Sequence, residues 1–225
     1  MRKLMVLLLA VVMAIVSFGL GGCSKQQAGP TAQPAKQESA ADLLGKGKNL
    51  PGLTYDYVTT MNETRMTGKV WMAGKKMKTE TMEEKQKMIA ILDGEANVVY
   101  NYMPEQNMIM KLAFDPGMVA KTPDQYGGEV DAAKVKVLET TMYDGVRCKV
   151  LLVEEKQGQA QTKMWVREDY GIPLRVEVTE TGGGKLVMEY KNMKIGALPA
   201  DTFQLPAGVP VTDMSEMMKQ TPKQP

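Results

Sequence analysis

Apolar and polar residues alternate along most of the chain that follows residue 52. The stretch 65–72, for example, places Met66, Val70 and Met72 on one side, with arginine, threonine and lysine between them. A period of two is typical of strands that bury one face of an antiparallel sheet. Turn signals such as Asp144-Gly145 separate the alternating stretches. The pattern predicts eleven strands, at 53–61, 64–73, 75–82, 87–93, 96–103, 107–113, 134–143, 146–155, 161–167, 173–180 and 185–194.

One long segment, 114–132, interrupts this succession of strands. It contains two prolines and three glycines around a short stretch, 118–121, that has the length of one helical turn. Long loops inside a compact domain are often functional. We therefore predict that 114–132 forms a lid over one face of the sheet.

The chain begins with a separate apolar segment. Arg2 and Lys3 precede an apolar run from residue 4 to residue 20, and small residues and Cys23 follow it. A positive start, an apolar run and small residues are the three parts of a secretory signal. The run is also close to the length of a membrane span, so an uncleaved signal anchor is the alternative.

The end of this run favours cleavage. Leu20-Gly21-Gly22-Cys23 resembles the lipobox of bacterial lipoproteins. The resemblance implies that the signal is cut before Cys23 and that its thiol carries a diacylglyceryl group, with acyl chains such as palmitate. Two or three acyl chains hold a protein stably to a bilayer. Cys23 is therefore expected to be a membrane anchor.

Residues 24–50 contain no aromatic residue and few large apolar ones. Such a composition buries too little surface to offset the entropy of ordering. The chain is therefore expected to divide into a signal peptide at 1–22, the lipidated cysteine and a flexible tether at 23–50, a β domain at 51–211 and a C-terminal tail at 212–225.

Charge and composition exclude several classes of function. Removal of residues 1–22 takes away Arg2 and Lys3 and leaves equal numbers of basic and acidic residues, which argues against nucleic acid as a partner. The chain has no histidine, the usual general base and commonest metal ligand. We expect no enzyme activity, no metal and no cofactor. Cys148, alone once Cys23 is acylated, is expected to be a buried small hydrophobe.

Four stretches carry a family resemblance: "TGKVWMAGKKMKTE", "ILDGEANVVYNYMPEQNMIMKL", "WVREDYGIPLRVEVTE" and "EYKNMKIGALPADTFQLPAGVPV". Together, over roughly 53–211, they resemble the LolA-like outer-membrane lipoprotein-sorting proteins and their LolB relatives. The resemblance implies a mainly β fold, a half-open antiparallel barrel of about eleven strands with a short helical lid over an apolar cavity. Members of the family carry lipoprotein acyl chains, or other lipids, between membranes. The soluble carrier of the family is not itself a lipoprotein, whereas this chain is expected to be anchored through Cys23.

Methionine is unusually frequent, and 17 of the 20 methionines lie beyond the signal segment. This flexible side chain is over-used at promiscuous apolar surfaces, which suits the binding of variable acyl chains. The alternative is that methionine only fills the core of a sheet covered by a helix, with no ligand. The side chains expected to line the cavity are Met66, Val70, Met72, Met108, Met110, Leu112, Val150, Leu174, Val176 and Met188.

These observations predict a membrane-anchored lipoprotein that binds a lipid or lipoprotein acyl chain in the bacterial envelope. Its expected partners are the membrane, the acyl chain and an envelope protein. Ser24 follows Cys23, so no aspartate retains the protein in an inner membrane. The expected location is the outer leaflet of the cell membrane or the periplasmic side of an outer membrane. The alternative function is that of a sensory or protein-binding lipoprotein, without enzyme activity, on the same fold.

Overall fold

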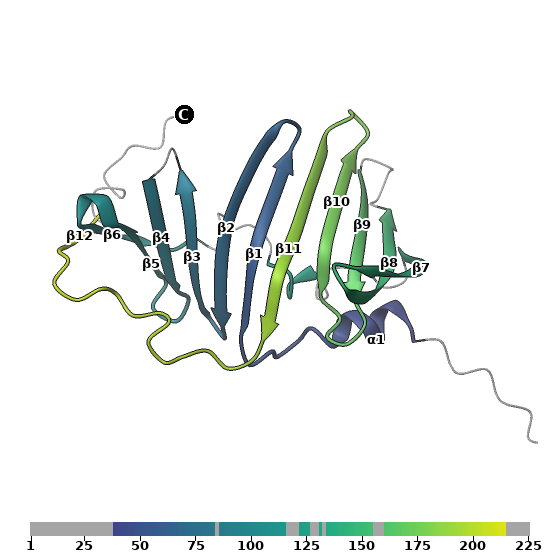
Figure 1. Ribbon diagram of the computed structural model, residues 1–225, viewed down its shortest axis with the longest axis horizontal. Helices are drawn as coiled ribbons and strands as arrows, with labels where there is room; N and C mark the ends of the chain where they lie inside the picture. The colour runs from purple at the N-terminus through teal and green to yellow at the C-terminus, as the bar shows by residue number, and fades with distance from the viewer. Residues whose placement is uncertain are drawn as a thin grey trace, which may run out of the picture. The chain divides into compact units, whose positions relative to one another are not determined.

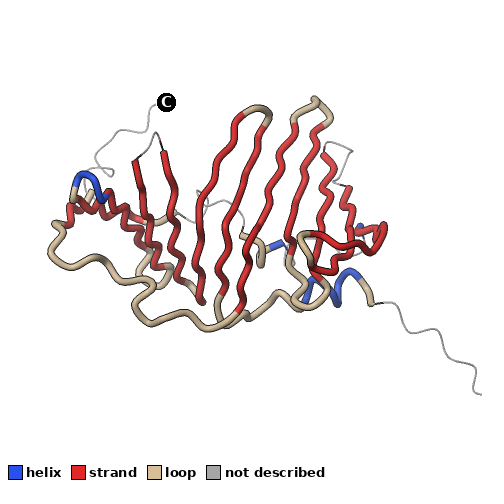
Figure 2. The backbone as a smooth tube through the Cα atoms, viewed as in Figure 1, coloured by secondary structure: helices blue, strands red, loops and turns tan. Residues whose placement is uncertain are grey.

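The computed structural model describes residues 38–83, 86–115, 122–126, 131, 134–154 and 160–214. Within them, twelve strands form one sheet with the order β12-β6-β5-β4-β3-β2-β1-β11-β10-β9-β8-β7 (Figure 1). Figure 2 shows how much of the described chain is strand. The strands are β1 (Leu53–Met61), β2 (Thr64–Ala73), β3 (Lys76–Glu83), β4 (Gln86–Asp93), β5 (Val98–Met103), β6 (Met108–Ala113), β7 (Val135–Tyr143), β8 (Val146–Glu154), β9 (Ala160–Arg167), β10 (Pro173–Glu180), β11 (Lys185–Ile195) and β12 (Val211–Asp213).

All eleven predicted strands are present, and the mainly β, antiparallel fold is confirmed. The sheet is open, with β7 and β12 as its two edges. Hairpin turns use the residues that the sequence indicated: Asp144 and Gly145 have φ values of 50° and 75°, as a tight turn between twisted strands requires. The 3-10 turn η1 (Pro104–Gln106) connects β5 and β6.

The twelfth strand was not predicted. β12 pairs in parallel with β6, and the Asp213 carboxylate forms a 2.8 Å ion pair with the Lys111 ammonium. The segment between β11 and β12 carries the chain from the middle of the sheet to its far edge (Figure 1). The boundary expected at residue 212 is therefore corrected, because Val211–Asp213 belongs to the sheet; residues 215–225 lie outside the described residues.

The predicted tether also needs correction. Residues Ala40–Gly45 form the helix α1, whose Leu43 and Leu44 are 0% and 2% exposed. Ser39 is its N-cap: its hydroxyl accepts a hydrogen bond from the Asp42 backbone N–H at 3.1 Å. The polar composition of 24–50 hid a short helix with a strongly apolar side. Residues 1–37, which include Cys23, lie outside the described residues.

Helix α1 packs at the turn that follows β9. The Lys46 ammonium donates to the backbone carbonyl of Glu168 at 2.7 Å. Glu38, just before the helix, pairs with Lys46 at 2.6 Å and with Lys149 of β8 at 3.2 Å. The hydrogen bond from Lys46 is the largest influence that lowers the pKa of the Glu38 carboxyl. Polar contacts thus fix both ends of the helix over an apolar centre.

The core lies on the face of the sheet that α1 covers, which we call the inner face. Tyr55 of β1 and Tyr190 of β11 meet edge to face there, with ring centroids 5.3 Å apart. The core cluster comprises Ala40, Leu43, Leu44, Leu53, Tyr55, Val70, Tyr126, Leu151, Met164, Val166, Ile172, Val176 and Tyr190.

Candidate functional site

The strand register aligns apolar side chains across the inner face. Leu53 of β1 lies opposite Met72 of β2 on one side and Ile195 of β11 on the other. The alignment continues strand by strand to β6 and places one apolar residue on each of seven neighbouring strands. We call this set the apolar row: Leu112, Val99, Leu92, Met77, Met72, Leu53 and Ile195.

Most of the apolar row is half-buried. Leu53 is 2% exposed and belongs to the core, and Met72 and Met77 pack against it. Leu92, Val99 and Leu112 are half-buried and are not among the residues of that cluster. The β4–β6 part of the inner face therefore presents apolar surface beyond the core.

The neighbouring register on the opposite face has a different character. Its members are Lys111, Tyr100, Ile91, Lys78 and Trp71. Two of these residues are lysines, and the Lys78 ammonium lies 4.8 Å from the Trp71 ring centroid. This row therefore carries positive charge, whereas the apolar row contains no charged residue. An uninterrupted apolar row is thus a feature of the inner face.

The row is long enough for a lipid chain. Neighbouring strands lie about 4.8 Å apart, so the four spacings from β6 to β2 span about 19 Å. One leaflet of a bilayer is about 15 Å of hydrocarbon. One acyl chain could therefore lie along the row without bending back.

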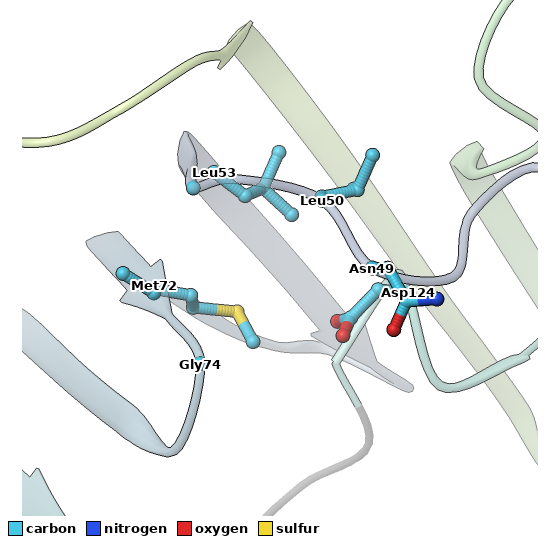
Figure 3. Close-up of a pocket in the computed structure, with 8 residues that line it drawn as sticks. Asn49, Leu50, Leu53, Met72, Gly74 and Asp124 are labelled. Atoms are coloured by element: carbon cyan, nitrogen blue, oxygen red, sulfur yellow. The ribbon is translucent and has the colours of Figure 1, made fainter.

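A cavity of about 200 Å³ opens where the row crosses β1 and β2 (Figure 3). At about 30 Å³ for a water-sized group, it holds about seven such groups, less than a drug-sized ligand needs. It therefore fits one end of an amphiphile rather than a whole lipid. Its lining residues are Asn49, Leu50, Gly52, Leu53, Met72, Ala73, Gly74 and Asp124.

Most residues that the sequence predicted for the cavity share the inner face. Met72 lines the cavity, and Leu112 belongs to the apolar row. Met66, 50% exposed, lies opposite Thr59 near the β1–β2 turn, away from the cavity. The remaining inner-face members are Val70, Met108, Met110, Val176 and Met188.

Val150 and Leu174 do not join this face. Val150 lies opposite Trp165, whereas its neighbour Leu151 lies opposite Met164 of the core cluster. Leu174, 3% exposed, sits at the register shift before Arg175 and is not part of that cluster. Both faces of β8 are buried, so alternation could not tell which face was the inner one.

Sequence reasoning missed several residues of the site. Leu92 and Val99 lie in stretches that are apolar on both faces, "IAILD" and "NVVY", where a period of two is hard to detect. Met77 is flanked by lysines, and its signal was the alternation in "KKMKTE" alone. Asp124 had no signal, because only the fold brings its turn to the cavity.

Three buried tyrosines border the site. The Tyr55 hydroxyl donates to the Met72 sulfur at 3.9 Å, and the Tyr126 and Tyr190 hydroxyls lie 3.7 Å from the Met188 sulfur. Burial is the main cause that raises the pKa of Tyr55 and of Tyr190. Because burial raises the pKa of Tyr55 and Tyr190, these two hydroxyls keep their protons at neutral pH, and the thioether sulfur is a weak acceptor for them.

Within the part of the chain that the structure describes, no group of three histidine, cysteine, aspartate or glutamate side chains is arranged to hold a metal ion. The same residues include no helix that is long and apolar enough to span a bilayer. Of the predicted lid at 114–132, only 114–115, 122–126 and 131 are described; its expected helical turn at 118–121 lies outside them.

Cys148 is fully buried, as predicted, and burial raises the pKa of its thiol to about 11. Because the thiolate is the reactive form, we expect iodoacetamide at pH 8 to modify Cys148 about a hundredfold more slowly in the folded protein than in urea. Peptide mapping separates Cys148 from Cys23. Equal rates in the two conditions would contradict the buried placement.

No family model matches the sequence. An uncharacterised protein of Methanocaldococcus jannaschii is 24% identical over 184 residues, which are 79% of this chain and 53% of that protein. The chain thus spans about half the length of this curated relative.

The solved structure of an uncharacterised conserved protein from Thermus thermophilus has the same fold: its TM-score is 0.53 at 13% identity, over 77% of this chain and 96% of that one. LolA-like proteins are among the structural neighbours. They include a LolA superfamily protein of Nitrosomonas europaea, with 13% identity and a TM-score of 0.34 over 75% of this chain and 98% of that chain. Another neighbour is the MucA/MucB complex of Pseudomonas aeruginosa, with 16% identity and a TM-score of 0.43 over 75% of this chain and 61% of that chain.

Proposed function

We propose that this chain is a lipoprotein of the bacterial envelope, anchored through Cys23, that binds a lipid or lipoprotein acyl chain along its inner face. The apolar row carries the proposal: seven neighbouring strands each contribute an apolar residue, and those on β4–β6 lie outside the core cluster. The resemblance of the sequence to LolA-like proteins points the same way.

The proposed mechanism is partition rather than chemistry. Each methylene that leaves water gains about 0.8 kcal/mol, so a chain of modest length binds without any directional contact. Methionine side chains at Met72, Met77 and Met110 adapt to chains of different shape. A surface of this kind selects for length and hydrophobicity, which suits a carrier or receptor of lipids.

Native mass spectrometry tests the proposal. We expect the protein to carry a discrete adduct of lipid mass and to take up added lipid in a titration. Met110 is half-buried on the inner face two residues before Leu112, so Met110→Lys places a charge beside the row and should reduce uptake at least about tenfold.

Met82→Lys is the matched control, because Met82 is 62% exposed and lies opposite Lys87, beyond the row. It should leave uptake unchanged, and circular dichroism should be the same for both variants. A clean mass with no lipid uptake by the unsubstituted protein would reject the proposal.

The edge strand β7 favours a second candidate, a protein-binding lipoprotein. Val137, Leu138 and Met142 are 37%, 49% and 64% exposed there. Apolar side chains on an edge strand are a template for pairing with another chain. Lipid bound after purification separates the two candidates, since only the first requires it.

A further inference from the structure

Two buried oxygen atoms in one turn have no hydrogen-bond partner among the residues that the structure describes. They are the Oδ1 atom of Asp124 and the Oγ1 atom of Thr122, both in the segment 122–126. Thr122 is 6% exposed, and its turn is closed by a 2.9 Å hydrogen bond from its own backbone N–H to the Gln125 side chain. A buried carboxylate oxygen without a donor is rare in folded proteins. Because Oδ1 is closed to a water-sized group, a ligand in the cavity would meet this half-buried carboxylate at Oδ2, the oxygen that is not buried.

Asp124 lines the cavity. Figure 3 shows its carboxylate directed toward the Met72 side chain, with Asn49 beside it. Leucine, methionine, alanine, glycine and Asn49 make up the rest of the described lining, so Asp124 is the one charged group in it. The negative charge of Asp124 also contributes, after burial, to the raised pKa of the Tyr55 hydroxyl.

The described lining therefore has one anionic group, Asp124, beside the apolar side chains of Leu50, Leu53 and Met72. A bare metal ion would satisfy the carboxylate but leave the contacts with Leu50, Leu53 and Met72 unused. A water molecule would fill about one seventh of the cavity. An amphiphile with a positively charged, hydrogen-bond-donating head would pair with Asp124 through its head and contact the apolar side chains through its chain.

We propose that the cavity binds the primary ammonium head of an amphiphile, with the N–H groups donating to Asp124 and the apolar chain running along the row from Met72 toward β6. This inference rests on the proposed function, because the apolar chain of the ligand would bind along the apolar row. It adds a preference for the head, which the row alone cannot supply. A charge-assisted hydrogen bond is about twice as strong as one between neutral groups, so it is a source of such a preference.

Calorimetric titration of the full chain with three octyl compounds at pH 7 tests the preference. Octylammonium should bind at least about tenfold more tightly than octanol, and octanoate should bind least, because its charge repels that of Asp124. In Asp124→Asn the octylammonium and octanol affinities should become equal within about threefold. Asp201→Asn, at an exposed turn outside the cavity, should keep the preference.

Short-chain phosphatidylethanolamine and phosphatidylcholine distinguish the source of the head. Both place a cationic nitrogen at the end of the headgroup, but the trimethylated nitrogen has no N–H to donate. Preference for phosphatidylethanolamine indicates a lipid headgroup, and binding of octylammonium alone indicates a free amine.

Equal binding of octylammonium and octanol by the unsubstituted protein, or a preference that survives Asp124→Asn, would overturn the inference. Absence of binding by all octyl compounds would also overturn it. The first two results concern the head alone and leave the proposed function intact, which is decided separately by the lipid adduct and its loss in Met110→Lys. Absence of all octyl binding would also count against the proposed function, because the row is expected to bind a chain of modest length without any directional contact.

Discussion

Replacing Gly171 by alanine is expected to lower the midpoint of thermal unfolding by about 10 °C. Gly171 follows β9 and has a φ of +64°, which costs an alanine about 1 kcal/mol. A Cβ atom there would also lie 1.8 Å from the backbone carbonyl oxygen of Leu43. Helix α1 must therefore move off the sheet, and the loss of two buried leucines brings the total cost to about 4 kcal/mol.

Gly145→Ala is the matched control. Gly145 has a φ of +75°, but a Cβ atom there would have nothing within 4 Å. It therefore measures the backbone strain alone, about 1 kcal/mol. Calorimetry of both variants isolates the contact with α1, and equal shifts in their unfolding midpoints would show that α1 is not held at Gly171.

The same contact affects the candidate site. The residues that connect α1 to β1 supply one wall of the cavity, through Asn49, Leu50 and Gly52. Gly52 is itself confined, because a Cβ atom there would lie 2.5 Å from the Gly196 carbonyl oxygen. Displacement of α1 should therefore reduce ligand affinity as well as stability.

The strands were predictable from sequence for a physical reason. A sheet that is wet on one face imposes a period of two, and "TRMTGKVWM" or "PLRVEV" shows it over most of its length. Asp144-Gly145 and similar pairs then mark the turns, so strand limits follow within two or three residues. β12 escaped because three residues are too few to show any period.

The site was predictable only in part, because it depends on register. Alternation placed Met72 and Leu112 on apolar faces of their strands, but it could not place them in the same row. That alignment comes from the turns and pairings of the four consecutive hairpins from β2 to β6. Val150 was assigned to the wrong face for a different reason. Apolar residues are buried on both faces of β8, so alternation did not show which of them belong to the inner face.

Helix α1 escaped for an energetic reason. A helix of six residues is unstable alone, and its composition resembles that of the polar sequence before it. It forms because Leu43 and Leu44 reach the core cluster, which sequence patterns beyond residue 52 do not reveal. Local composition predicted disorder, and a long-range contact overrode it.

Leu43→Ala is accordingly expected to lower the free energy of unfolding by about 3 kcal/mol, because Leu43 is 0% exposed in the core cluster. Chemical denaturation measures the change. Leu138→Ala makes the same substitution on β7, where the side chain is 49% exposed, and should change stability by less than about 0.5 kcal/mol. If residues 38–50 formed a flexible tether instead, Leu43 would contact nothing, and Leu43→Ala would destabilise the protein no more than Leu138→Ala.

Combining Leu43→Ala with Gly171→Ala tests whether both act through the docking of α1. Once alanine at 171 has displaced the helix, Leu43 has little burial left to lose. The double variant should therefore be more stable than the sum of the single effects predicts, by at least about 1 kcal/mol. Strictly additive losses would mean that Leu43 stabilises the core without the contact between α1 and Gly171, and the cavity wall would then not depend on that contact.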